Sequence, residues 1–269
     1  MTHFSWSWRR SERVVVDSEI PLMPKFNRWR RAQRYEQGYW EGVAARISKG
    51  SASQLDWYRW RADQLMLKLR SLGLDSLETG EAAVVEVGSG PIGVVPFLQA
   101  KERVAVDPLE PFYARNSVLT ALRTDSVQYR AGVGEKLPCE TGRYDVAIIE
   151  NCIDHVQNPR AVRAELTRVL KHDGILYLTV NCRSPWGYLV HRVLSRLRLD
   201  PGHPHTFTPD RASTFVENGG FRILSREVGS YAEAWRADWS AAEARARVKA
   251  MLGVSEFLVS TVSQRANAH

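Results

Sequence analysis

The amino-acid sequence predicts an α/β fold preceded by a helical segment. Two observations predict it: two helical patterns come first, and from residue 82 short β-branched runs alternate with helical stretches. Such alternation is typical of a parallel sheet with helices on both faces. We therefore expect a basic, aromatic-rich N-terminal extension or cap over residues 1–79 and an α/β domain over residues 80–269.

The N-terminal extension has the periodicity of two amphipathic helices. Apolar residues recur every three or four positions over 32–47 and again over 55–69, which is the helical period. Gly73 is placed to end the second helix. Residues 49–53 form the predicted turn, in which Ser53 is a candidate N-cap.

Charge is distributed unevenly along the chain. Residues 1–70 hold 14 Lys/Arg and 7 Asp/Glu, a net charge of +7, and this equals the net charge of all 269 residues. Six of the nine tryptophans lie in the same stretch: Trp6, Trp8, Trp29, Trp40, Trp57 and Trp60. The stretch could bind an anionic substrate, a nucleic acid or an acidic membrane surface. The favoured interpretation is a helical cap whose tryptophans pack on the core, because aromatic side chains are usually buried.

Composition narrows the class of protein. No apolar run approaches the 18 residues of a membrane span, and residues 1–10 lack the apolar centre of a secretory signal, so we expect a cytoplasmic protein. Cys139, Cys152 and Cys182 are widely spaced and form no C-x-x-C pair. We therefore expect core thiols, without a disulfide framework or structural zinc.

The α/β domain is predicted to hold seven strands. They are 82–87, 103–106, 127–130, 144–149, 175–180, 221–228 and 256–263. The predicted helices among the first five are 93–100, 111–123 and 159–171. An amphipathic helix follows over 184–198, with Trp186 and Val193 on an apolar face for which core packing is the default and a lid or membrane contact the alternative. Residues 231–252 are predicted to form a helical insertion.

A glycine-rich turn leaves the first predicted strand. The sequence Val-Val-Glu-Val-Gly-Ser-Gly-Pro-Ile-Gly spans residues 84–93, and Gly88 and Gly90 permit the backbone to approach a ligand closely. Asp107 ends the next predicted strand, 19 residues after Gly88. A carboxylate there could accept hydrogen bonds from both hydroxyl groups of a ribose. The combination indicates a ligand that contains adenosine.

A dinucleotide is the alternative ligand for this turn, because its fingerprint has the same spacing. A dinucleotide loop presents backbone N–H groups to a pyrophosphate. Pro91 removes one such donor. The loop therefore favours an adenosine ligand without phosphate, and an NAD-dependent oxidoreductase remains the alternative.

Further segments, in order along the chain, strengthen this interpretation. They are the glycine turn, Asp107, and the stretches 131–138, 144–159, 165–176 and 205–210. Together they resemble the class I S-adenosylmethionine-dependent methyltransferases, in the branch of the ubiquinone/menaquinone and small-molecule O-methyltransferases. The resemblance covers about residues 80–230. It implies a Rossmann-like, seven-stranded, mostly parallel sheet with an antiparallel last strand, and S-adenosyl-L-methionine as the cofactor.

The resemblance also implies roles for particular residues. Glu86, Gly88 and Gly90 would flank the methionine part of the cofactor, and Asp107 would hold its ribose. The adenine would be bordered by Gly134 and Glu135, and Asn151 would lie beneath the sulfonium end. No metal is required, because a sulfonium methyl group is already activated and catalysis consists mainly of positioning and proton removal.

Three histidines are candidates for contact with the methyl acceptor. His155 follows the fourth predicted strand, and His203 and His205 lie in a loop that enters a helix begun by Thr208 and Pro209. Each could be a general base or a substrate contact, and each could instead be structural. The sequence shows no further ligand cluster around them, so we expect no metal.

The sequence therefore predicts methyl transfer to a small-molecule acceptor, most simply O-methylation of a sugar, glycolipid or polyketide-like compound. The expected acceptor carries an anionic or a lipid-linked group. One alternative is an RNA methyltransferase, motivated by the basic N-terminus. The segment Glu150–Ile153 lacks the Asp/Asn-Pro-Pro-aromatic motif of base-amino methylases, and Cys182 lacks the Pro-Cys of cytosine-C5 enzymes. Another alternative is a non-catalytic scaffold, against which the intact glycine turn and Asp107 argue.

Overall fold

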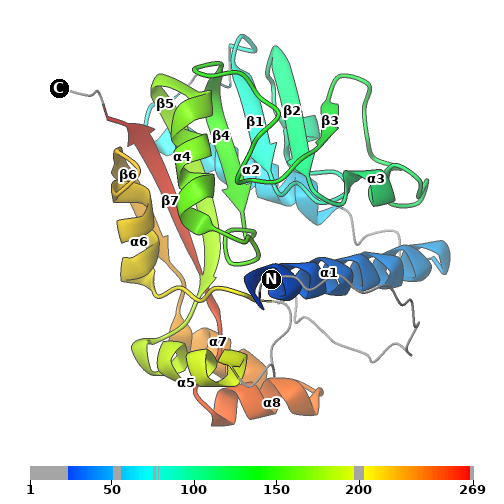
Figure 1. The fold of residues 1–269 in the computed structure, drawn as a ribbon, viewed down its shortest axis with the longest axis vertical. Coiled ribbons are helices and arrows are strands. Elements are labelled where there is room, and N and C mark those ends of the chain that lie inside the picture. The colour runs from blue at the N-terminus through cyan, green and yellow to red at the C-terminus, as the bar shows by residue number, and fades with distance from the viewer. Residues whose placement is uncertain (1–23, 51–55, 75–76, 78, 197–202, 267–269) are drawn as a thin grey trace.

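The computed structural model describes residues 24–50, 56–74, 77, 79–196 and 203–266. Its centre is a seven-stranded sheet of order β3-β2-β1-β4-β5-β7-β6 (Figure 1). Strand β7 runs antiparallel to its neighbours β5 and β6, and every other neighbouring pair in the described sheet is parallel. The predicted α/β fold with an antiparallel last strand is confirmed.

All seven predicted strands are present. Their bounds are β1 Ala83–Val87, β2 Glu102–Asp107, β3 Gln128–Ala131, β4 Tyr144–Glu150, β5 Leu170–Cys182, β6 Phe221–Val228 and β7 Phe257–Arg265. Every residue of β1 is buried, which explains its continuous apolar run, since a central parallel strand is covered on both faces. Because β1 runs parallel to both β2 and β4, the carboxyl ends of these three strands share one edge of the sheet.

Helices cover both faces of the sheet. On one face lie α4 (Pro159–Val169) and α6 (Pro209–Glu217), which begin at the capping side chains Asn158 and Thr208. The other face is covered by α2 (Trp57–Ser71), and α1 (Pro24–Ser48) crosses near the carboxyl ends of the strands (Figure 1). The two predicted N-terminal helices are thus present, and Ser53 and Leu55 lie outside the described residues.

The N-terminal helices share a hydrophobic core with the sheet. Trp40 of α1 is 6% exposed, and Leu65 and Leu69 of α2 are buried beside β1 residues such as Val84. Trp60, in contrast, is 61% exposed, and Trp6 and Trp8 lie outside the described residues. The tryptophans of the extension are therefore divided between core and surface. No helix in the described part of the chain has both the length and the apolar character to span a membrane.

The helix predicted over Gly93–Ala100 is wrong. Only the short 3₁₀ helix η3 (Val95–Phe97) forms there, with Pro96 inside it. Gly93 adopts a φ of 78°, which lies outside the right-handed helical region. The backbone N–H groups of Val94 and Val95 donate to the Glu86 carboxylate. A buried carboxylate therefore replaces the hydrogen bonds that a longer helix would make.

The helix predicted over Pro111–Arg123 is also wrong. It ends after one turn, as α3 (Glu110–Tyr113), and turns follow. The Oδ1 atom of Asn116 accepts hydrogen bonds from the N–H groups of Val118 and Leu119. Asparagine side chains compete in this way with the helical hydrogen bonds of the backbone, and the apolar period alone did not reveal it.

The C-terminal half contains a group of helices with exposed apolar residues. Helix α5 (Pro185–Arg196) lies beside α7 (Tyr231–Ser240) and α8 (Ala244–Met251), so the predicted insertion is two helices (Figure 1). Core packing of the α5 apolar face is wrong for Trp186 and Val193, which are 63% and 55% exposed. These two side chains are exposed because α5 lies beyond the sheet, where no layer of the described residues covers its apolar face.

We expect Leu65→Ala to lower the free energy of unfolding by about 2–5 kcal/mol, because Leu65 is fully buried and its loss leaves a cavity. The matched control is Leu67→Ala on the same helix, where the side chain is 56% exposed, and it should change stability by less than about 0.5 kcal/mol. Urea denaturation measures both. Equal effects would show that α2 is not part of the core.

Candidate active site

The turn after β1 is a backbone structure that only glycine permits. Gly88 and Gly90 have φ values of 74° and 64°, in the left-handed region that glycine adopts without strain. A Cβ atom at Gly88 would lie 2.3 Å from the Sγ atom of Cys152. The N–H group of Gly88 donates to the carbonyl of Val106, at 2.8 Å, which holds the turn against β2.

Asp107 at the end of β2 meets this turn, as the spacing in the sequence predicts. Its Oδ2 atom accepts a hydrogen bond from the N–H group of Gly90 at 2.9 Å, and its Oδ1 atom accepts one from Leu109 at 2.8 Å. Burial raises the pKa of Asp107 to about 7, although both hydrogen bonds favour the charged form. Each carboxylate oxygen can still accept a second hydrogen bond from a ligand.

Glu86 lies beneath the turn and carries an unsatisfied oxygen. Its Oε2 atom accepts hydrogen bonds from Val94 and Val95, at 2.7 and 3.2 Å. Its Oε1 atom is buried without a hydrogen-bond partner. Burial raises the pKa of Glu86 to about 8, and the nearby guanidinium of Arg61 opposes this rise. An acceptor without a partner costs free energy, so this oxygen is suited to a donor on a ligand.

The N-terminal helices contribute side chains that the sequence did not single out. Arg61 of α2 donates to Glu150 at the end of β4, 89 residues away. Burial disfavours the charge of Arg61, but Glu150 raises the pKa of Arg61 overall. A Cβ atom at Gly90 would lie 2.9 Å from the Tyr58 hydroxyl and 3.3 Å from the Trp40 ring. The extension therefore closes over the glycine turn, and only its basic, aromatic composition hinted at this.

The other predicted cofactor residues occupy the same edge of the sheet. A Cβ atom at Gly134 would lie 3.2 Å from Val162 of α4. Glu135 accepts hydrogen bonds from the N–H groups of Gln157 and Asn158, so its carboxylate organises the loop before α4. Asn151 follows β4 with a φ of 51°, and its Oδ1 atom accepts from the N–H group of Asn181.

Two of the candidate histidines come together around a carboxylate. His155 lies in the loop after Asn151, and His203 lies in the loop before α6. The Nε2 atom of His155 lies 3.7 Å from Oδ1 of Asp154, and the Nε2 atom of His203 lies 4.0 Å from Oδ2. The two imidazole rings have centroids 4.8 Å apart. Asp154 is 3% exposed. We name these three residues the histidine–aspartate cluster.

His205 has a different environment. Its backbone N–H group donates to the carbonyl of Asp154, and its Nε2 atom lies 2.9 Å from the carbonyl of Val156. A carbonyl oxygen accepts only, so Nε2 carries the proton in this arrangement. The contacts of His205 therefore hold the cluster's loop in place.

Charged residues near His203 were also missed by sequence reasoning. Arg183 donates to Oε1 of Glu256 at 2.8 Å, and Lys249 donates to Oε2 at 2.8 Å. Burial favours the neutral form of Glu256, but these two cations, with a smaller contribution from His203, lower its pKa to about 2. Arg183 follows β5, Lys249 lies in α8 and Glu256 precedes β7, so no local pattern connects the acid with both of its partners.

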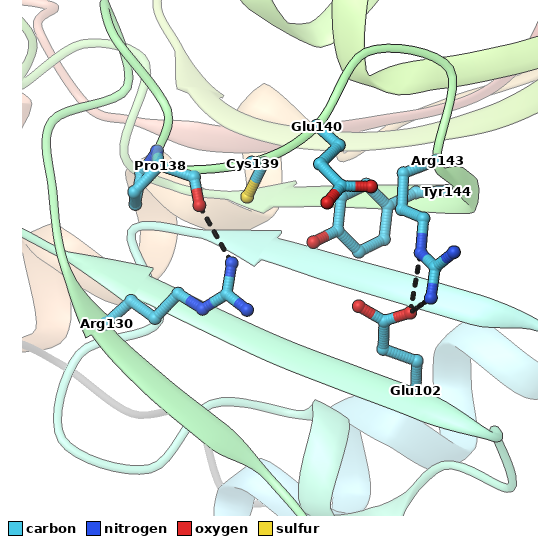
Figure 2. A pocket seen from close by; sticks show the side chains of 7 residues that line it. All are labelled: Glu102, Arg130, Pro138, Cys139, Glu140, Arg143 and Tyr144. Atoms are coloured by element: carbon cyan, nitrogen blue, oxygen red, sulfur yellow. Dashed lines mark hydrogen bonds and ion pairs between the residues drawn. The ribbon is translucent and has the colours of Figure 1, made fainter.

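A separate cavity of roughly 380 Å³ lies away from these residues. Figure 2 shows its lining, in which Arg143 points toward Glu102 and Arg130 toward the carbonyl of Pro138. Glu102 and Tyr144 begin β2 and β4, so the cavity lies toward the amino ends of those strands. It contains none of the predicted site residues, and the candidate site remains at the carboxyl edge.

The carboxyl-edge residues fit an amino-acid nucleoside. The unsatisfied Oε1 atom of Glu86 suits an ammonium group, and the remaining acceptor capacity of Asp107 suits ribose hydroxyls. Glu86 in β1 and Asp107 at the end of β2 are both buried beside the turn that the glycines shape.

Comparisons with known proteins indicate the family and the fold of the chain. Residues 85–178 match the family model of the methyltransferase domain. No curated protein matches the chain in sequence.

Solved structures share the fold. A protein assigned as a sarcosine dimethylglycine methyltransferase from Galdieria sulphuraria matches with a TM-score of 0.57 and 14% identity, over 77% of this chain and 85% of that one. A second match is the geranyl diphosphate C-methyltransferase of Streptomyces coelicolor A3(2), in complex with Mg²⁺, geranyl-S-thiolodiphosphate and S-adenosyl-L-homocysteine. Its TM-score is 0.53 and its sequence identity 14%, over 77% of this chain and 75% of that one. The [4+2]-cyclase SpnF matches with a TM-score of 0.53 and 14% identity, over 75% of this chain and 82% of that one. At these identities the likeness shows the fold alone, and the cyclase shows that this fold also hosts other reactions.

We expect Glu86→Gln to change how stability depends on pH. The folded-state pKa of Glu86, about 8, exceeds its ordinary 4.5, so the native state holds this proton more tightly than the unfolded chain. The group's contribution to stability is present below pH 4.5 and is lost as pH rises toward 8. Between pH 5 and 8 the variant should gain about 3–4 kcal/mol relative to wild type, because one pKa unit corresponds to about 1.4 kcal/mol.

Denaturation at pH 5 and pH 8 measures this difference. The matched control is Glu81→Gln, because the Glu81 side chain is 76% exposed, and its difference from wild type should not vary with pH. A Glu86→Gln profile parallel to that of wild type would contradict the assignment.

Proposed function

Since this chain carries a methyltransferase domain of the class I S-adenosylmethionine-dependent type, we propose that it methylates a hydroxyl oxygen of a small molecule, such as a sugar, a glycolipid or a polyketide-like compound. S-adenosylmethionine supplies, when bound, a methyl group already activated by a sulfonium sulfur. The remaining tasks belong to the protein, which must hold both reactants in line and remove the hydroxyl proton.

The carboxyl edge of β1 and β2 holds the cofactor in this proposal. Glu86 accepts a hydrogen bond from the ammonium group with its unsatisfied Oε1 atom, and Asp107 accepts from the ribose hydroxyls. Gly134 and Glu135 border the adenine. Asn151, at the end of β4, lies toward the sulfonium end.

The histidine–aspartate cluster is the observation that carries the proposal. In the proposal this cluster receives the acceptor. It begins three residues after Asn151, in the loop that leaves β4, and brings the centroids of two imidazole rings to 4.8 Å from each other at the same edge of the sheet. Imidazoles can accept a hydroxyl proton near neutral pH. His205 serves as a positioning residue, because its backbone and ring contacts hold the cluster's loop.

Enclosure of the site supports a small acceptor over a nucleic acid. Helices α1 and α2 place Trp40 and Tyr58 against the glycine turn, and the cation Arg61 points inward to Glu150. Part of the basic charge of the extension is therefore paired with a buried carboxylate inside the protein and is not available to bind a nucleic acid at the surface. Structural neighbours named for sarcosine and dimethylglycine and for geranyl diphosphate act on small molecules.

The exposed apolar residues support an acceptor with an apolar or lipid-linked part. Trp186 of α5 donates a hydrogen bond to the carbonyl of Leu252, next to Met251, which is 71% exposed. These residues lie on the helices that flank the carboxyl edge (Figure 1). Exposed Arg192 and Arg247 lie on the same helices, which suits an acceptor with an anionic group.

We expect Asp107→Ala to weaken binding of S-adenosylhomocysteine by about 10–100-fold, because it removes charge-assisted hydrogen bonds worth about 1.5–3 kcal/mol. Isothermal titration calorimetry measures the affinity. Asp107→Asn keeps one carboxamide oxygen and should lose less, and Asp125→Ala, in an exposed turn, should bind as wild type does. If wild type and Asp107→Ala bind alike, the cofactor site is wrongly placed, and binding of NAD in its stead would favour the oxidoreductase.

We expect His203→Ala to reduce the rate of methyl transfer by about 10²–10⁴-fold, which is the usual range for loss of a proton-accepting group. The assay follows label from methyl-labelled S-adenosylmethionine into hydroxyl-bearing sugars, glycolipids and polyketides, with total RNA as a further substrate. Affinity for S-adenosylhomocysteine should not change. The control is His172→Ala, an exposed histidine in β5. Label in RNA alone, or in no acceptor at all, would refute small-molecule methylation.

A further inference from the structure

The histidine–aspartate cluster presents ligand atoms of the kind that hold metal ions. One atom each from Asp154, His155 and His203 lies within 4.8 Å of the others. His155 and Asp154 are adjacent in the loop after β4, whereas His203 arrives from a loop 48 positions later in the chain. The sequence alone predicts no metal, because the two histidines become neighbours only in the folded protein.

A second observation points to a ligand. The Oδ1 atom of Asp154 is buried without a hydrogen-bond partner, in a residue that is 3% exposed. This oxygen faces the His155 Nε2 atom at 3.7 Å, which is too long for a hydrogen bond. A buried carboxylate oxygen without a partner is costly. A cation between the three side chains would satisfy it.

We propose that Asp154, His155 and His203 bind a divalent transition-metal ion. Tetrahedral ligand atoms about 2.1 Å from Zn²⁺ lie about 3.4 Å apart, and the two measured separations here are 3.7 and 4.0 Å. The two Nε2 atoms face different oxygens of Asp154, and the three ligand atoms lie within 4.8 Å of one another. Metal binding therefore requires side-chain shifts of up to about 1.4 Å. Two imidazoles with one carboxylate favour zinc, iron, cobalt or nickel over Mg²⁺, which prefers oxygen ligands.

Three protein ligands leave a coordination position for the acceptor. Catalytic zinc sites keep such an open position, and the partial exposure of His155 and His203, at 25% and 18% of their side chains, leaves the cluster accessible. Metal binding stands on the geometry alone, whereas the role in catalysis rests on the proposed function. A hydroxyl group at the metal loses its proton more readily.

The reaction then balances without a further reactant. The hydroxyl proton passes to water, and an electron pair of the oxygen forms the new bond to the methyl carbon. The bond between that carbon and sulfur breaks, and its electron pair stays on sulfur. With a metal bound, the two histidines serve as its ligands, and water takes the proton that an imidazole would accept in the protein without metal.

Cobalt titration of the full-length protein tests the proposal. The protein is purified without a polyhistidine tag, treated with a chelator and titrated with Co²⁺, whose visible absorption reports coordination. We expect saturation at one Co²⁺ per chain and displacement by Zn²⁺. His203→Ala and Asp154→Asn should each weaken binding by about 10–100-fold or more. The control His172→Ala should bind as wild type does, and circular dichroism checks that each variant is folded.

The outcomes separate the metal from the methyl transfer. Absence of a saturable Co²⁺ band, or equal weakening by His172→Ala, overturns the metal site. Methyl transfer that persists in chelated protein without Co²⁺ binding overturns the metal site and leaves the proposed function standing. Saturable Co²⁺ binding that His203→Ala and Asp154→Asn abolish supports the site, even if no acceptor is methylated.

Discussion

The carboxylate of Asp107 is the interaction on which the site depends. It accepts one hydrogen bond from the turn after β1 and another from the chain that leaves β2, and so it joins the two loops at which we propose that the nucleoside binds. The glycine turn needs this anchor, because two of its residues have left-handed backbone conformations and, as glycines, no side chains that could pack and hold them in place. Burial makes the anchor expensive to ionise, which the hydrogen bonds from backbone N–H groups partly offset.

The same constraint explains the N-terminal extension. Three acids, Glu86, Asp107 and Glu150, are buried at one edge of the sheet, and like charges at short range disfavour ionisation. Arg61 reaches this edge from α2 and pairs with Glu150. An α/β domain without the extension would therefore leave Glu150 without this cation. The extension is as much a part of the electrostatics of the site as the loops of the sheet are.

Sequence reasoning succeeded where the physics is local. Short β-branched runs located all seven strands, and the spacing from Gly88 to Asp107 predicted their meeting. It failed at 111–123, where the Asn116 side chain replaces helical hydrogen bonds, because apolar spacing does not report that competition. It also missed the pair of Arg61 with Glu150, since nothing in a single sequence connects residues 89 positions apart. Which loops meet in space is decided by the topology of the sheet.

The chemistry of the protein follows from residues that the fold does not determine. A cyclase and methyltransferases share this architecture, so the order of strands is compatible with several reactions. The side chains beyond β4 differ in kind from the carboxylates that we propose hold the nucleoside, because they are imidazoles around one buried carboxylate. Their loop is anchored by His205 through hydrogen bonds with two carbonyl groups. In the proposed function, the rigid edge fixes where the methyl group is delivered, and the loop residues decide which atom can receive it.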